Sequence, residues 1–270
     1  MSDQPVPSAP ASDSQTPQPE VLTERRGKTL LITLNRPQAR NAVNLPLAEE
    51  LAAALDRLDD DPDLAVGVLA GAGKGFCAGM DLKAFVTGQR PWIGDRGFAG
   101  IVQRGPEKPL IAAIEGFALA GGLEVALACD LIVAARGARL GIPEVKRGLV
   151  AAAGGLLRLP RRIPYHLAME LALTGEPISA ERGHAIGLVN RLADEGAATA
   201  VALELAEQVA TGAPLSLIAS KRIVESQHDW SAQEMWERQG QISSPVLGSQ
   251  DAIEGSKAFA EKRPPAWQGR

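Results

Sequence analysis

Two glutamates are notable because each lies among apolar or glycine residues. Glu124 lies in the segment AGGLEVALACD (120–130), and Glu144 lies in the segment LGIPEVKRG (140–148). A lone carboxylate in a dry setting is costly, whereas two carboxylates that share one site can act as a general acid and a general base. A structural interpretation is also open, because an acid in the first helical turn interacts favourably with the helix dipole.

Two glycine-rich loops add a second possible kind of chemistry. In GKGFCAGMDLK (73–83) a predicted strand ends and Asp81 begins a predicted helix, while in IEGFALAGGLEVALACD (114–130) a glycine pair opens a helix. Backbone N–H groups are free at such places. The two loops together could direct two amides at one carbonyl oxygen, which is an oxyanion hole. Either loop alone is also consistent with a plain turn.

Other catalytic patterns are not matched. The segment GAGKGF (71–76) is not a phosphate loop, because Lys74 is followed by Gly75 and not by Ser or Thr. No G-x-S-x-G sequence is present. The histidines lack the spacing of metal ligands, so no metal site is expected; they are His166, His184 and His228. These observations argue against a nucleotide-binding P-loop, a serine hydrolase and a zinc enzyme.

The elements that must position these residues alternate along the chain. Apolar runs predict strands, and leucines at helical spacing predict a helix that begins near Asn44. The expected strands are 28–35, 64–73, 109–116 and 131–135, and the expected helices between them are 44–62 and 122–130. Alternation of this kind indicates an α/β fold with crossover helices.

The two ends of the chain differ from this pattern. Residues 1–20 are rich in Pro, Ser, Gln and Asp, which predicts a flexible tail. From about residue 196 only helical patterns follow, and a helical region of this kind often packs against another subunit. We therefore divide the chain into a tail (1–20), a core (21–195) and a C-terminal helical region (196–270).

Composition limits the partners and the setting. The net charge of −4 gives no general attraction to nucleic acid or to anionic membranes. Cys77 and Cys129 suggest no disulfide framework. The start of the chain lacks a signal-peptide pattern, and the apolar region 109–135 is interrupted by three acids. A cytoplasmic location is the simplest expectation, with no membrane and no nucleic-acid partner.

Several segments together resemble the enoyl-CoA hydratase/isomerase (crotonase) family, over about residues 22–270. The segments that carry the resemblance are LNRPQARNAVN (34–44), KGFCAGMDLK (74–83), IAAIEGFALAGGLEVALACDLIVAA (111–135), ARLGIPEVKRGLVAAAGGLLRLPR (138–161), LTGEPISAERGHAIGLVNRL (173–192) and AFAEKRPPAWQGR (258–270). The resemblance implies a spiral of β-β-α repeats, followed by helices that form a trimer or a hexamer. It also implies acyl-CoA substrates, no cofactor beyond the CoA of the thioester, and a place in fatty acid metabolism such as β-oxidation.

The resemblance further implies roles for individual residues. The oxyanion-hole donors fall on the backbone N–H groups of Met80 and Gly121, with Gly122 allowing close approach of the chain. The acid–base pair falls on Glu124, which orients and deprotonates water, and Glu144, which donates a proton. Positions that match CoA contacts are Arg40, Ala42, Ala78, Asp81, Leu82, Lys83 and, from across a subunit boundary, Phe259 and Lys262.

The resemblance leaves alternatives open. Many hydratases carry PGAGG where this chain has AAAGG (151–155), which affects the region expected to shape the water and acyl site. The segment 84–107, where family members differ in their acyl pocket, does not define the acyl group, so branched, steroid and carnitine-type groups remain open. A Δ3,Δ2-isomerase is the alternative within the family, although two retained acids favour hydration. A non-catalytic trimer that binds RNA or protein is the alternative from another class.

Overall fold

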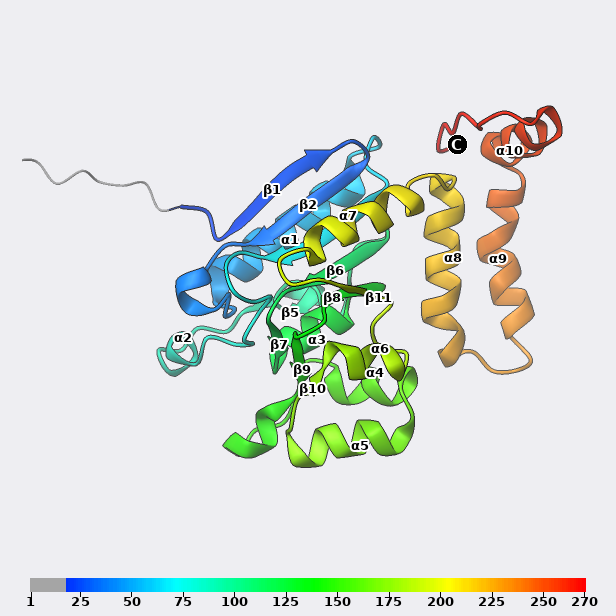
Figure 1. Ribbon diagram of the computed structural model, residues 1–270. Helices are drawn as coiled ribbons and strands as arrows, with labels where there is room; N and C mark the ends of the chain where they lie inside the picture. Colours follow the sequence, from blue (N-terminus) through cyan, green and yellow to red (C-terminus); the bar gives the residue numbers. More distant parts are fainter. Residues whose placement is uncertain (1–17) are drawn as a thin grey trace, which may run out of the picture.

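The computed structural model describes residues 18–270, and most of the predicted tail, residues 1–17, lies outside the described residues. The described chain is built on a six-stranded sheet (Figure 1). Its strands, in spatial order, are β1 (Val21–Arg26), β2 (Thr29–Leu34), β3 (Val66–Gly71), β6 (Leu110–Ile114), β8 (Leu131–Ala135) and β11 (Arg191–Ala193). Only the β1–β2 pair is antiparallel. The inner strands are apolar and buried, as parallel strands covered on both faces must be.

A second, smaller sheet stands beside the first. It consists of β10 (Ile178–Ser179), β9 (Arg139–Gly141) and β7 (Phe117–Leu119), and a short hairpin of β4 (Trp92–Ile93) and β5 (Gly97–Phe98) is separate. The chain passes from β6 to β7 and then into a helix, and it repeats this passage from β8 to β9. Each repeat therefore places one strand in each sheet before a helix, which is the spiral of β-β-α repeats expected from the resemblance.

Helices cover the sheets and also form a separate C-terminal region. The α-helices are α1 (Leu45–Asp60), α2 (Leu82–Val86), α3 (Gly121–Leu127), α4 (Gly155–Arg162), α5 (Tyr165–Thr174), α6 (Ala180–Ala185), α7 (Ala198–Val209), α8 (Pro214–Ser226), α9 (Met235–Leu247) and α10 (Gln250–Glu261). Short 3-10 helices are η1 (Pro37–Ala39), η2 (Gly94–Arg96), η3 (Pro143–Arg147) and η4 (Gln227–Asp229). Helix α1 begins after Asn44, near the predicted start, and Asn44 caps it by accepting a hydrogen bond from the backbone N–H of Leu47.

The six-stranded sheet has a buried cluster on each face. On one face α1 contributes its leucine stripe to the main core, with Leu51 and Leu55 fully buried. On the other face α7 packs through small residues, Ala198, Ala202 and Ala206, against strand residues such as Val68. The helix α7 therefore covers the sheet, although it lies within the region 196–270. The division of the chain at residue 195 stays a prediction.

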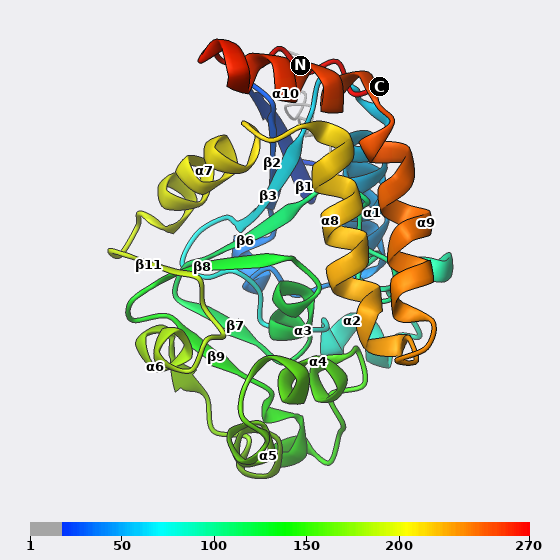
Figure 2. The ribbon, with the colours of Figure 1, turned by 90° about the vertical axis from the view of Figure 1, so that its right-hand side faces the viewer.

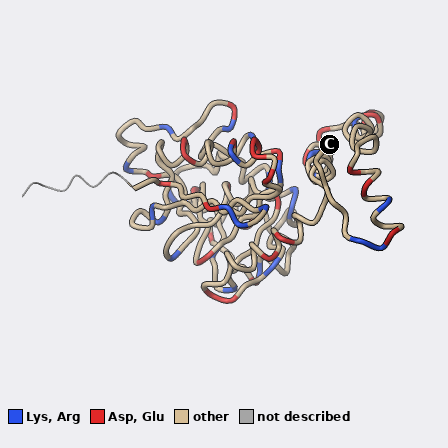
Figure 3. The backbone as a smooth tube through the Cα atoms, turned by 90° about the horizontal axis from the view of Figure 1, so that it is seen from above, with Lys and Arg blue, Asp and Glu red and all other residues tan. Residues whose placement is uncertain are grey.

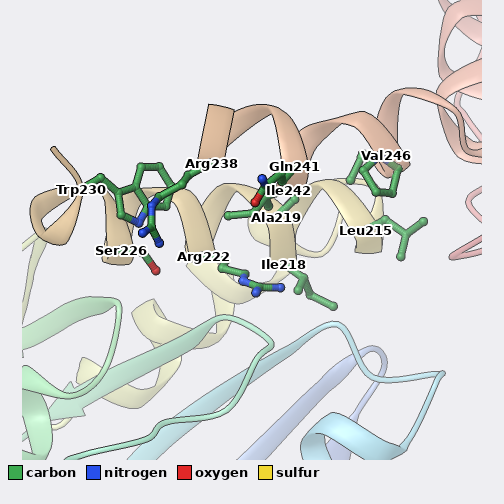
Figure 4. Close-up of a pocket in the computed structure, with 11 residues that line it drawn as sticks. Leu215, Ile218, Ala219, Arg222, Ser226, Trp230, Arg238, Gln241, Ile242 and Val246 are labelled. Atoms are coloured by element: carbon green, nitrogen blue, oxygen red, sulfur yellow. The ribbon is translucent and has the colours of Figure 1, made fainter. Parts of the chain in front are cut away.

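The helices α8, α9 and α10 extend away from the sheets (Figure 1), and in Figure 2 they face the viewer. Seen from above, this region projects well beyond the core, and positive and negative residues are interspersed along the chain (Figure 3). A cavity of about 500 Å³ lies between α8 and α9 and is lined by Ile218, Trp230 and Ile242, among others (Figure 4). No helix within residues 18–270 has both the length and the apolar character that a membrane crossing requires.

Candidate active site

The two glycine-rich loops meet in the structure. Cys77 and Ala118 form a β-bridge, so the loop that follows β3 runs beside the loop that follows β7. A Cβ placed on Gly79 would lie 3.0 Å from the backbone nitrogen of Gly121. Gly79 has a φ of 99°, a conformation that suits glycine. The backbone of Met80 and the backbone of Gly121 are therefore neighbours, although they lie far apart in sequence.

The amides at this meeting point are unpaired. Among residues 18–270, neither the Met80 N–H nor the Gly121 N–H donates a hydrogen bond to another residue. Both amides belong to partly or fully buried residues, where unpaired N–H groups are rare. Ala120, the residue before α3, has a φ of 52° although it is not glycine. Such strain persists where the surroundings enforce it, and it is concentrated at functional sites.

Gly122 allows these loops to approach each other. A Cβ on Gly122 would overlap the carbonyl oxygen of Cys77 and lie 2.7 Å from the carbonyl carbon of the same residue. No side chain fits there without movement of the backbone. The role assigned to Gly122, close approach of the chain, has this contact as its physical basis.

Glu124 lies one turn further along α3 and is only 3% exposed. Its Oε1 atom accepts hydrogen bonds from the backbone N–H groups of Ala153, at 2.8 Å, and Gly155, at 2.9 Å. Burial and, to a lesser extent, repulsion from Glu144 raise the pKa of Glu124 to about 7, although the hydrogen bonds from the two N–H groups oppose the shift. The group can therefore change its protonation state near neutral pH.

Glu144 faces the same site from a different element. It lies in η3, is 9% exposed, and its Oε2 atom is buried without a hydrogen-bond partner among the described residues. Burial raises the pKa of Glu144. An unpartnered buried carboxyl oxygen is costly when charged, so the neutral form is favoured. The structure thus brings together two carboxyl groups that differ in hydrogen bonding, as an acid and a base must.

The AAAGG segment (151–155) contacts Glu124 through its backbone. The two hydrogen bonds to Glu124 come from peptide N–H groups, and Gly154, with a φ of 99°, turns the chain between them. A Cβ on Gly155 would lie 3.2 Å from Oε1 of Glu124, so glycine leaves the room that this contact needs. The alanines at 151 and 152 therefore leave the contact with the carboxylate intact.

Six of the predicted CoA positions lie on neighbouring segments at the surface. The backbone N–H of Ala78 donates to the carbonyl of Arg40 at 3.1 Å, and Val43 forms a β-bridge with Met80. Segment 40–43 therefore runs beside segment 78–81. These two segments and the start of α2 together carry Arg40, Ala42, Ala78, Asp81, Leu82 and Lys83.

The side chain of Asp81 is already engaged. Its Oδ1 atom accepts from the backbone N–H groups of Lys83 and Ala84, which caps α2, and its Oδ2 atom lies 3.1 Å from Nη1 of Arg36. The Arg36 guanidinium and the capped amides lower the pKa of Asp81 against the effect of burial. These contacts hold Asp81, the residue next to Met80, in place. A CoA contact by Asp81 stays a prediction.

Phe259 and Lys262 lie far from this surface within one chain. Both belong to the end of α10, which Figure 1 places on the opposite side of the molecule from α2. Phe259 is 87% exposed, which is unusual for a large aromatic residue. The resemblance assigned these two residues to a neighbouring subunit, and the position of α10 away from α2 is consistent with that assignment, which stays a prediction.

Sequence reasoning missed one residue that contacts the site. A Cβ on Gly121 would lie 2.8 Å from the ring of Phe98, so this ring packs directly against the Gly121 backbone. Phe98 is buried and makes an edge-on contact with Trp92, with ring centroids 5.3 Å apart. The sequence contained only a weak indication, which was three aromatic residues among glycines in the variable segment 84–107.

Comparison with known families and proteins identifies close relatives. The family model described as enoyl-CoA hydratase/isomerase matches residues 24–270. A protein named enoyl-CoA hydratase EchA19, from Mycobacterium tuberculosis, is 42% identical over 262 residues, which cover 93% of this chain and 97% of that protein. A carnitinyl-CoA dehydratase from Proteus mirabilis is 41% identical over 253 residues, which cover 91% and 97%.

Solved structures agree with these sequence matches. The crystal structure of an enoyl-CoA hydratase from Mycobacterium tuberculosis superposes with a TM-score of 0.92 and 56% identity, covering 94% of this chain and all of that one (100%). A carnitinyl-CoA hydratase from Mycobacterium avium superposes with a TM-score of 0.76 and 44% identity, with coverages of 94% and 100%.

Proposed function

The chain belongs to the enoyl-CoA hydratase/isomerase family and is an enzyme of the hydratase type, and from this premise we propose that it adds water reversibly across the α,β double bond of a 2-enoyl-CoA. The reverse reaction dehydrates a 3-hydroxyacyl-CoA. The observation that carries the proposal is the pairing of Glu124 and Glu144 beside two unpaired amides.

In the proposed reaction the amides of Met80 and Gly121 donate hydrogen bonds to the thioester oxygen. Negative charge grows on this oxygen as the enolate forms, and donors that are fixed in advance stabilise that charge. Each such donor contributes about 3–4 kcal/mol in other enzymes. Phe98 supports this arrangement because its ring packs on the Gly121 backbone.

The two carboxyl groups then divide the proton transfers. Glu124, as the carboxylate, takes a proton from water, and the resulting hydroxide forms a bond to Cβ. Glu144, as the neutral acid, gives its proton to Cα, so that one water molecule is added in total. The two N–H groups that bind Oε1 favour the charged form of Glu124, and the unpartnered Oε2 atom favours the neutral form of Glu144.

Absorbance in the enoyl-thioester band tests this proposal. We expect wild type to remove the band of crotonyl-CoA, and Glu124→Gln and Glu144→Gln each to lower kcat by at least about 100-fold. Glu204→Gln is the matched control, because Glu204 is exposed on α7. Conversion of a 3-enoyl-CoA to its 2-isomer without hydration would instead indicate the isomerase.

The acyl group is a separate part of the proposal. The relatives include carnitinyl-CoA dehydratases, so carnitinyl-CoA is the second substrate to test. A higher kcat/KM with carnitinyl-CoA than with 3-hydroxybutyryl-CoA would assign the chain to that reaction. Binding of CoA thioesters without any turnover across a panel of acyl groups would overturn the hydratase proposal and favour a binding protein.

We also propose that the chain assembles into trimers or pairs of trimers. The support is the large apolar surface of α8 to α10, which includes Trp236, Leu247 and Phe259, all strongly exposed in the isolated chain. A neighbouring copy that covers this surface could also bring Phe259 and Lys262 to the CoA surface. A cytoplasmic setting stays a prediction.

A further inference from the structure

The Arg158 side chain contacts both the turn that holds Glu124 and the segment that packs against Gly121. It lies one turn into α4, and its guanidinium folds back over Gly154, where an added Cβ would overlap Nη1. Gly154 lies between Ala153 and Gly155, the two residues whose N–H groups hold Glu124. Arg158 therefore packs on the turn that fixes the position of the Glu124 carboxylate.

The other end of the guanidinium reaches the element that supports the oxyanion hole. Nη2 of Arg158 donates to the carbonyl of Val102 at 2.6 Å. The N–H of Val102 in turn donates to the carbonyl of Phe98 at 3.3 Å, and the Phe98 ring packs on Gly121. The Arg158 side chain thus connects the segment 98–102, which packs against Gly121, with the turn at Gly154, which holds Glu124.

Charged groups from four elements surround this connection. Glu124 of α3 and Glu225 of α8 attract the Arg158 guanidinium, while Arg161 and Arg162 of α4 repel it. Burial lowers the pKa of Arg158.

The acidic groups near Arg158 have charged neighbours of their own. Glu144 of η3 faces Glu124, and Arg147 of η3 faces Glu144. Lys221 and Asp130 face Glu225. Arg158 is the cation that acts on Glu124 in this set.

We propose that Arg158 is a positioning residue for hydration, which clamps the Phe98–Val102 segment to the Gly154 turn and so keeps the oxyanion donors and Glu124 in register. The inference rests on the proposed function, because it assigns Arg158 a part in the same site. Its positive charge has a second effect, since it favours the carboxylate form of Glu124 that must accept a proton from water.

Two variants of Arg158 test the proposal, with Arg161→Met as the matched control. Arg161 lies on the same helix but is exposed and pairs with Asp229 at the surface. We expect Arg158→Met to lower kcat by about 10- to 100-fold, because small misplacements of reacting groups are costly. KM should change far less, since no contact with the CoA moiety is removed. Arg158→Lys keeps the charge and should recover part of kcat.

A second readout does not depend on turnover. Infrared spectra recorded across pH follow the neutral carboxyl band of Glu124, which is identified by its loss in Glu124→Gln. We expect the titration midpoint of Glu124 to rise in Arg158→Met, to return towards the wild-type value in Arg158→Lys, and to stay unchanged in Arg161→Met.

The outcomes separate the two proposals. An unchanged midpoint in Arg158→Met, or a kcat equal to that of Arg161→Met, would overturn the role of Arg158. If the wild-type protein hydrates no thioester, the proposed function fails, yet the infrared titration still shows whether Arg158 acts on Glu124. An Arg158→Met protein that does not fold leaves the decision to Arg158→Lys, in which a wild-type kcat would contradict the clamp.

Discussion

At the scale of single residues, Glu124 combines deep burial with hydrogen bonds that favour its charge. Its pKa of about 7 means that the folded state holds a proton that the unfolded state releases between about pH 4.5 and pH 7. The stability contributed by the neutral group is therefore complete below about pH 4.5. It is lost as the pH rises through about 7.

This linkage predicts a pH-dependent effect of Glu124→Gln on stability. Glutamine stays neutral at every pH, so the variant avoids the cost of a buried charge at pH 8. We expect its free energy of unfolding to improve relative to wild type by up to about 3 kcal/mol between pH 5 and pH 8. Urea unfolding at both pH values measures this difference. Equal differences at the two pH values would contradict the raised pKa.

Gly122 is the second residue whose identity is restricted by its surroundings, because a side chain there would overlap the Cys77 backbone. Gly122→Ala forces a Cβ into the backbone of Cys77, so we expect a loss of more than about 2 kcal/mol of stability. Gly240→Ala is the control, because Gly240 lies in α9 with nothing within 4 Å of an added Cβ. There alanine should stabilise the helix by about 0.5–1 kcal/mol. Thermal melting distinguishes the two, and similar melting temperatures would contradict the close approach.

At the scale of elements, the attachment of α8 depends on Lys221. Its Nζ atom lies 2.9 Å from Oδ2 of Asp130 and donates to the carbonyls of Pro106, at 2.8 Å, and Lys108, at 3.1 Å. The Lys221 side chain is only 9% exposed. This buried group joins the C-terminal helices to the strands that carry the site.

Lys221→Met leaves Asp130 without its cation in a largely buried position. We expect a loss of about 3–5 kcal/mol in the free energy of unfolding. Hydrogen exchange should also show faster opening of α8 than of α7. Lys257→Met on the exposed face of α10 is the control, with an expected change below about 0.5 kcal/mol. If exchange in α8 is unaffected, Lys221 does not anchor this helix.

Sequence patterns predicted the helices and the longer buried strands well, and the short or exposed strands poorly. The predicted strand 131–135 matches β8, and the predicted strand 28–35 contains β2. Strand β1 was missed, because its sequence VLTERR has one buried residue and no apolar periodicity. Strands β7 and β9 were also missed, since three residues are too few to show a period.

The sequence led to the candidate site residues but not to the geometry around them. Resemblance indicated Glu124 and Glu144, and the structure places them together. Nothing in the sequence indicated that peptide groups of Ala153 and Gly155 hold Glu124, or that Phe98 packs on Gly121, because backbone contacts and long-range packing leave no local pattern. The proposed catalytic roles of Glu124 and Glu144 stay predictions until the variants are measured.

At the scale of the whole molecule, the exposed apolar surface of α8 to α10 predicts association. We expect sedimentation velocity to show trimers or hexamers, and Trp236→Asp to shift the distribution towards monomers, because charge opposes burial of this surface. Leu22→Asp is the control, since Leu22 is exposed on β1, away from these helices. A wild-type protein that sediments as a monomer would contradict the proposed assembly.

Glu124 accepts its hydrogen bonds from backbone N–H groups and not from side chains, which has a consequence for the evolution of this sequence. Side chains are replaced by mutation, but every residue brings a peptide N–H except proline. Position 152 is exposed and can therefore vary in size and polarity while these hydrogen bonds to the carboxylate persist, whereas Ala151 is buried in the main core and can vary less. Variation at position 152 can thus alter the region expected to shape the acyl site while the two hydrogen bonds to Glu124 remain. Proline at position 153 or 155 is not compatible with these contacts, because it would remove the N–H group that donates to Glu124.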